Sequence, residues 1–150
     1  MKTFEIVPVL DRLLRLLCRS LPAYLVDAKA WEGPGSEPIR QAIRNLVADQ
    51  RMYAERVAKA IVECGGHPRP GSFPAEFTAK HDLSLSYLLL DVLDGLDQDI
   101  AWYEQCATEL ENVSSLHALA AEILGNAKGH LDVLGKIAGE MAENTNKTAG

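Results

Sequence analysis

Apolar residues recur at intervals of three and four along most of the chain, which is the spacing that gathers side chains on one face of an α-helix. The clearest stripe consists of Ile39, Ile43, Leu46, Gln50, Tyr53, Val57, Ala60 and Cys64. Almost no stretch alternates apolar and polar residues with the period of two that a half-buried strand requires. The pattern therefore predicts an all-α protein with helices at about 5–32, 36–64, 82–110 and 114–142.

Prolines and glycines indicate where the expected helices begin, bend and end. Pro22 lies inside the first window, and we expect a kink there because its ring removes one backbone hydrogen bond. Ser36 is a suitable capping residue for the second helix, and Gly65 with its glycine neighbour ends that helix. We expect one domain over 1–142 and a flexible C-terminal tail over 143–150.

The connector over 65–81 decides the expected topology. It contains three prolines and is much longer than the links after the first and third helices. A helix of about 28 residues is roughly 42 Å long, whereas about 17 extended residues reach roughly 56 Å. The connector can therefore return the chain to the starting end, so that the second and third helices run parallel. A bundle with one long crossover in the middle is the ferritin-like arrangement.

Charge, hydropathy and cysteine spacing narrow the class of protein. The 150 residues carry a formal net charge of −6, which disfavours nucleic acid as a partner, because phosphate binding depends on a surplus of Lys and Arg. The unbroken apolar stretches are far shorter than the roughly 20 residues that span a bilayer, so we expect no membrane insertion. The three cysteines, Cys18, Cys64 and Cys106, are widely spaced and odd in number, unlike those of a disulfide-rich protein or a zinc site. We therefore expect reduced thiols and a cytoplasmic protein.

Three further features carry a resemblance that covers nearly the whole chain. They are Leu21-x-Ala23 continuing to Trp31, the run Ile61-Val62-Glu63-Cys64-Gly65-Gly66-His67-Pro68, and the spacing through the fourth helix to His130. In these features the chain resembles the ferritin-like superfamily, which includes bacterioferritin and the di-iron carboxylate proteins. The resemblance implies metal ligands at defined places, because in such families two helices each give one Glu and two each give a Glu-x-x-His pair.

The first two helices lack most of the ligands that the resemblance implies. Ser20 stands where the first helix would give its Glu, and its side chain is uncharged and short. Gln50-x-x-Tyr53 stands where the second helix would give Glu-x-x-His. A register shifted by one residue gives Asp49-x-x-Met52, which has a carboxylate but no imidazole.

The third and fourth helices keep little more. Leu96 lies near the expected position in the third helix, with Asp99 about one turn away and also inward, and the fourth helix has Ala127-x-x-His130, in which only the His matches. So few anionic ligands leave the charge of two iron ions uncompensated in a desolvated bundle. We therefore expect no di-iron centre and no cofactor.

The remaining inward polar residues need hydrogen-bond partners, because an unpaired polar group in a core is costly. We expect them to form one polar cluster at the vestigial metal-site positions, which are Ser20, Gln50, Tyr53, Asp99, Tyr103, Ala127 and His130. The alternative is a divergent metal-binding protein or oxidoreductase that holds a single metal through His130 with Asp99 or Asp49. A third possibility is a small-molecule pocket between the helices, near Ser20 and Ala127.

One face of the fourth helix carries the small residues Ala118, Ala121, Gly125 and Gly129. Glycine in a helix costs about 1 kcal/mol relative to alanine, and small side chains let a second helix approach closely. This face favours a homodimer, and a plain solvent-facing surface is the alternative of equal weight. The sequence as a whole predicts a non-catalytic bundle with a binding or structural role, whose partner is a small molecule or a protein of unknown identity.

Overall fold

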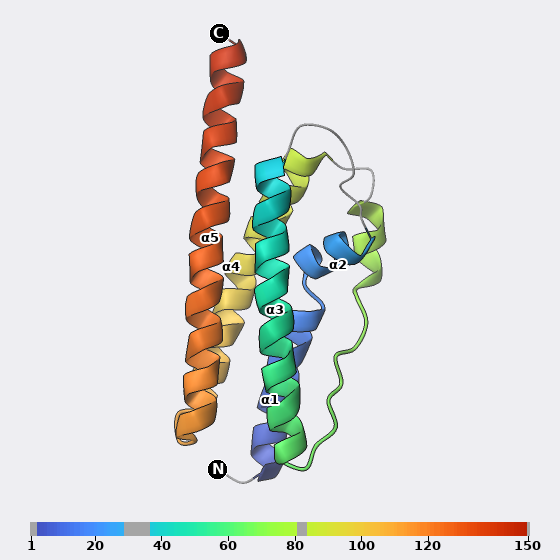
Figure 1. The fold of residues 1–150 in the computed structure, drawn as a ribbon, viewed down its shortest axis with the longest axis vertical. Coiled ribbons are helices and arrows are strands. Elements are labelled where there is room, and N and C mark those ends of the chain that lie inside the picture. The colour runs from blue at the N-terminus through green and yellow to red at the C-terminus, as the bar shows by residue number, and fades with distance from the viewer. Residues whose placement is uncertain (1–2, 29–36, 81–83, 150) are drawn as a thin grey trace.

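The computed structural model describes residues 3–28, 37–80 and 84–149 of the chain. Four long helices form a bundle: α1 (Thr3–Cys18), α3 (Glu37–Glu63), α4 (Leu85–Glu109) and α5 (Ser114–Ala149) (Figure 1). A short helix, α2 (Leu21–Ala28), follows α1, and a 3-10 helix, η1 (Ala75–Lys80), precedes α4. The described ranges contain no strand, and the prediction of an all-α protein is confirmed.

The path of the chain confirms the predicted topology. Helices α1 and α3 run antiparallel, and the connector after α3 then returns along the bundle to the end where α3 began (Figure 1). Helix α4 therefore runs parallel to α3, and α5 returns antiparallel to α4 (Figure 1). The long crossover lies between the second and third long helices, as a ferritin-like bundle requires.

The prediction of one first helix with a kink at Pro22 is wrong, because the chain forms two helices here. Helix α1 ends at Cys18 and α2 begins at Leu21, so Pro22 stands in the first turn of α2, where its missing N–H is not needed. The Oγ of Ser20 accepts a hydrogen bond from the backbone N–H of Ala23 at 3.2 Å and so caps α2. A serine two residues before a proline starts a new helix instead of bending the old one.

Other helix ends agree with the expected chemistry, with small shifts. Gly65 has a φ of 84° and ends α3, since a left-handed residue here suits glycine. Helix α4 begins at Leu85, after Ser84, whose side chain accepts from the N–H of Tyr87. The expected end of the first helix at 29–32, the cap at Ser36 and the expected start of α4 at 82 lie outside the described residues.

The last helix is longer than expected. The predicted end was about residue 142, with a flexible tail over 143–150, but α5 continues to Ala149. The sequence beyond Gly139 contains neither proline nor glycine until Gly150, so nothing in it stops the helix. In Figure 1 this C-terminal part of α5 extends beyond the ends of the other helices.

Leucine, isoleucine and valine side chains fill most of the interior, and all four long helices contribute to one core. Helix α4 packs closely on α5, and α1 packs closely on α3, whereas the seam between α1 and α4 is less closely packed. No helix among the described residues has the length and apolar character that a membrane span needs. The loose seam between α1 and α4 is where the candidate site lies.

Candidate functional site: a cleft at the break in the first helix

The positions of the expected metal ligands lie in the middle of the bundle and hold non-ligating side chains. Gln50 and Ser20 are only 4% and 8% exposed, and Tyr53, Tyr103 and Ala127 are also buried. A void of about 10 Å³ lies between these helices, lined by Gln50, Tyr53, Tyr103, Asn126, Ala127 and apolar residues. A void of this size holds one water at most, and no carboxylate or imidazole lines it.

Ser20 and Gln50 form the buried polar contact at the break in the first helix. The Ser20 hydroxyl donates to the side-chain Oε1 of Gln50 at 2.9 Å. The same Ser20 oxygen accepts the N–H of Ala23, so one side chain both starts α2 and ties the break to α3. The sequence identified both residues as inward and polar, and the structure brings them together.

His130 lies elsewhere, at the partly buried edge between α3 and α5. Its Nε2 is 2.7 Å from Oδ2 of Asp49, and the side-chain amide of Asn126 donates to the same oxygen at 2.8 Å. The Asn126 hydrogen bond, and with it the His130 contact, lowers the pKa of the Asp49 carboxyl despite its partial burial. The imidazole therefore pairs with Asp49 and takes no part in the Ser20 contact.

The two tyrosines of the expected cluster line the small void together with Gln50. Burial raises the pKa of Tyr103, and the nearby carboxyl of Asp99 raises it further. Tyr53 has a pKa raised first by burial and then by the neighbouring Glu122, which is also paired with Arg56. The small void is thus lined by four members of the expected cluster, Gln50, Tyr53, Tyr103 and Ala127. Ser20 contacts Gln50, and His130 contacts Asp49. That these residues form one polar cluster stays a prediction.

These side chains do not fit a pair of iron ions. The expected ligand position of the first helix holds Ser20, which lies between α1 and α2, and the pair in α3 holds Gln50 and Tyr53. None of these supplies the anionic oxygens that such ions need. Asp49 and His130 are hydrogen-bonded to each other, and Asp99 faces a different cavity. Within the described residues, no group of three or more His, Cys, Asp or Glu side chains is arranged to hold a metal ion.

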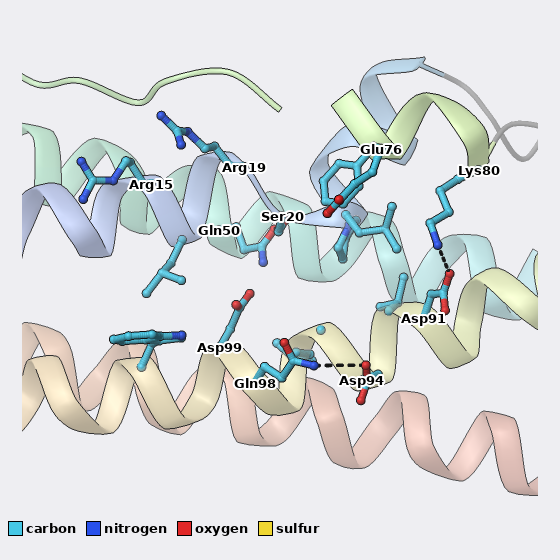
Figure 2. Close-up of a pocket in the computed structure, with 18 of the residues that line it drawn as sticks. Arg15, Arg19, Ser20, Gln50, Glu76, Lys80, Asp91, Asp94, Gln98 and Asp99 are labelled. Carbon is cyan, nitrogen blue, oxygen red and sulfur yellow. Dashed lines mark hydrogen bonds and ion pairs between the residues drawn. The ribbon is translucent and has the colours of Figure 1, made fainter. Parts of the chain in front are cut away.

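A cleft of about 870 Å³ lies between α1, α2, η1 and α4 and reaches Gln50 on α3 (Figure 2). Its apolar lining consists of Leu16, Leu21, Pro22, Phe77, Ala79, Val92, Leu96 and Trp102. Its charged and polar lining consists of Arg12, Arg15, Arg19, Ser20, Gln50, Glu76, Lys80, Asp91, Asp94, Gln98 and Asp99. Gly95 on α4 completes the wall.

Charges of opposite sign lie on opposite walls of the cleft. Arg15 projects from α1 and Arg19 from the break just after it, and Asp94 and Asp99 project from α4 (Figure 2). No described residue forms an ion pair with Arg15, whereas Asp94 accepts a hydrogen bond from Gln98 at 3.2 Å. Burial raises the pKa of the Asp99 carboxyl from 3.8 to about 7. The cleft is therefore polar at its walls and presents one largely buried carboxyl near its inner end.

The crossover covers one side of this cleft and is held there by specific contacts. Lys80 Nζ pairs with Asp91 at 2.6 Å, and Nε of Arg19 donates to the backbone carbonyl of Pro70 at 3.0 Å. The ring of Tyr24 on α2 lies 5.3 Å from that of Phe73 and 5.6 Å from that of Phe77. The break in the first helix opens the bundle here, and the crossover forms the wall of the opening.

Sequence reasoning found part of this site. Ser20, Gln50 and Asp99 were expected inside the bundle and do line the cleft, and a pocket near Ser20 was one of the open alternatives. The cleft does not extend to Ala127, which lines the small void instead. Arg15, Arg19 and Trp102 were missed. The available signal was the spacing of Ser20 and Pro22, which marks a helix start and hence a gap in the bundle wall.

The small residues of α5 lie where the sequence placed them. Ala118, Ala121, Gly125 and Gly129 are exposed on one side of the helix. A Cβ atom added at Gly125 or Gly129 would meet nothing within 4 Å. Packing within this chain therefore does not require glycine at either position.

Comparison with solved structures identifies the fold. The chain matches a crystal structure of ferritin-like, diiron-carboxylate proteins from Bacillus anthracis str. Ames with a TM-score of 0.75 and 16% sequence identity. The match covers 91% of this chain and 96% of that chain. No protein-family model matches the chain, and no curated protein matches it. With its crossover between α3 and α4, the chain has the ferritin-like fold.

Proposed function

We propose that this chain is a non-catalytic ferritin-like bundle that has lost the di-iron site and binds a small organic molecule in the cleft. The observation that carries the proposal is that the cleft reaches Ser20, in the break after α1, and Gln50 on α3. These are two positions at which the resemblance would place metal ligands. Its volume of about 870 Å³ lies within the usual range for small-molecule sites. The cleft thus gives a ligand access to these two positions of the bundle interior.

The donor chemistry of the interior supports loss of the metal. Each of the four long helices would contribute at least one carboxylate to a di-iron centre, yet the central void is lined by amide, phenol and apolar groups. The one imidazole of α5 near this level, His130, pairs with Asp49 at the edge of the bundle. The neighbouring protein from Bacillus anthracis is titled a diiron-carboxylate protein, so the proposed change is one of ligands on a common fold.

The cleft offers a mixed surface that suits an amphipathic organic ligand. The Arg15 guanidinium, which forms no ion pair with a described residue, attracts an anionic substituent, and Leu16 and Trp102 provide apolar contact. Trp102 is 47% exposed although it is a large hydrophobic residue, and Arg12 lies 5.9 Å from the centre of its ring. Partly exposed aromatic rings beside arginines are common in binding sites.

The test of binding is to fill the cleft without disturbing the core. Gly95 lines the cleft, and a Cβ at this position meets nothing within 4 Å. G95L therefore occupies cleft volume and gains helix propensity of up to about 1 kcal/mol. G135L is the matched control. Gly135 is also helical, and a Cβ added there meets nothing within 4 Å, but Gly135 is exposed on α5 and does not line the cleft.

The probe is 1-anilinonaphthalene-8-sulfonate, whose sulfonate and aromatic rings match the Arg15 and Trp102 end of the cleft. We expect saturable fluorescence enhancement with the original protein and with G135L, and at least tenfold weaker binding with G95L. Equal binding by all three proteins, or none by the original protein, would contradict a binding role for the cleft.

The same proposal includes a homodimer formed through α5. The exposed Gly125 and Gly129 lower helix propensity without any packing reason within the chain, and close approach of a second α5 supplies such a reason. Sedimentation velocity at micromolar concentration tests it. The expected species has twice the 16.4 kDa chain mass, and G125K with G129K should convert it to monomer. Particles of a single chain mass would contradict the dimer.

We also propose a cytoplasmic location. The three cysteines Cys18, Cys64 and Cys106 are free thiols in the structure, and burial raises the pKa of Cys106 and Cys18, which keeps these thiols protonated and unreactive. Free thiols of this kind suit a reducing compartment. Cell fractionation tests the location, and recovery of the chain outside the cytoplasm would contradict it.

A further inference from the structure

We propose that the inner end of the cleft binds a neutral planar group with a hydrogen-bond donor and an acceptor side by side, such as an amide or lactam edge, between Gln50 and Asp99. The inference rests on the proposed binding function of the cleft and specifies the chemistry of its ligand. It is carried by the two side chains that face each other across this part of the cleft in Figure 2.

Gln50 supplies a donor at the inner end of the cleft that has no acceptor among the described residues. Its side chain is 4% exposed, and its Oε1 is already bonded to the Ser20 hydroxyl. Ser20 Oγ accepts from Ala23, so its hydrogen is available for that Oε1 and the amide nitrogen of Gln50 is directed into the cleft (Figure 2). No described residue accepts a hydrogen bond from this nitrogen. A ligand acceptor in the cleft would give this donor a partner.

Asp99 supplies the complementary acceptor on the opposite wall. Its carboxyl points from α4 toward Gln50 (Figure 2), and within the described parts of the chain it forms neither a hydrogen bond nor an ion pair. Burial raises its pKa to about 7, which reflects the cost of keeping this oxygen pair charged and unpartnered. An N–H group on a ligand would satisfy the carboxyl directly.

The pairing of these two groups selects among ligand chemistries. A carboxylate ligand would accept from Gln50 but would meet a second carboxyl at Asp99. An ammonium ligand would suit Asp99 but would leave the Gln50 N–H facing a positive charge. A neutral amide or lactam accepts from Gln50 through its C=O and donates to Asp99 through its N–H. Sites that pair a buried donor and acceptor reject analogues that lack either group.

The test uses three bicyclic compounds of nearly equal size. The first is 2-quinolinone, which has the lactam C=O and N–H. The second is N-methyl-2-quinolinone, which lacks the N–H donor. The third is 2-methoxynaphthalene, a methyl ether that lacks the lactam edge altogether. Dissociation constants come from chemical-shift titration of the 15N-labelled chain. We expect 2-quinolinone to bind at least tenfold more tightly than either analogue.

Variants of the chain assign the preference to each side chain. Q50M, which keeps similar volume, should reduce binding of both quinolinones and thereby remove their advantage over the ether. D99L should remove the advantage of 2-quinolinone over its N-methyl analogue, and retained spectral dispersion checks that each variant folds. The comparison among compounds needs only the original protein, so the inference stays testable if a variant unfolds.

The outcomes separate this inference from the proposed function. If the three compounds bind equally and G95L blocks all of them, the cleft binds ligands but the inference is overturned. If none binds or G95L changes nothing, while G135L also behaves as the original protein, both the inference and the binding function fail. A tenfold lactam preference that Q50M and D99L each reduce supports both.

Discussion

Individual side chains in this bundle show how its core accommodates polar groups. Ser20 and Gln50 satisfy each other at 2.9 Å, while Asp49 holds both Asn126 and His130. The inward direction of Ser20 and Gln50 followed from helical periodicity in the sequence. The partner of His130 did not, because Asp49 and Gln50 are adjacent in sequence but face different neighbours, and only packing of α3 against α5 decides which of them meets the imidazole.

A prediction at this scale concerns Asp99, because burying its carboxylate in the charged form lowers the stability of the folded chain. Its pKa is about 7 in the folded chain, compared with 3.8 ordinarily. The folded state therefore holds the proton more tightly than the unfolded state, so stability falls as pH rises from about 4 to about 7 and stays lowered above that. D99N removes this cost. We expect it to be more stable than the original chain above pH 7, by at most about 4 kcal/mol.

Urea denaturation at pH 5, 6, 7 and 8 checks this expectation. The advantage of D99N should grow with pH and level off above pH 7. D97N is the control, because Asp97 is exposed on the same helix, and it should show no comparable trend. A pH-independent difference between D99N and the original chain would mean that burial of the Asp99 charge is not costly.

At the scale of elements, the break between α1 and α2 distinguishes this bundle from four continuous helices. The sequence predicted helix positions and the crossover well, because apolar spacing and connector length depend on local and steric facts. The sequence predicted a kink at Pro22, whereas the chain has a break between α1 and α2. Pro22 is compatible both with a bent helix and with the start of a new one. The cap formed by Ser20 with Ala23, and the bond from Ser20 to Gln50, favour a new helix. The break in turn opens the cleft.

Replacing the serine tests its two roles at the break. S20A loses both the cap of α2 and the partner of buried Gln50, so we expect a loss of about 2–3 kcal/mol in the free energy of unfolding. S84A is the matched control, because Ser84 caps α4 in an exposed position through the N–H of Tyr87, and it should cost about 1 kcal/mol. Equal losses for the two variants, measured by urea denaturation, would show that the Ser20 contact to Gln50 contributes nothing.

At the scale of the whole molecule, the chain shares the ferritin-like fold with a solved structure to which it is only 16% identical. Stripes of leucine, isoleucine and valine specify the bundle, and many sequences satisfy them. A metal centre instead needs particular donors at particular places, and the positions of Ser20, Gln50 and Ala127 lack them. The fold could therefore be predicted from pattern, whereas the cleft depends on how α1, η1 and α4 meet in space.

The central claim is that this bundle no longer holds a pair of irons. The most direct measurement is elemental analysis of the full chain purified from cells supplemented with iron and zinc, repeated after anaerobic addition of excess ferrous iron and removal of unbound metal. The account predicts far less than one metal ion per chain in both samples. Two iron ions bound per chain would contradict it, and a single stoichiometric ion would favour the alternative of a metal site at His130.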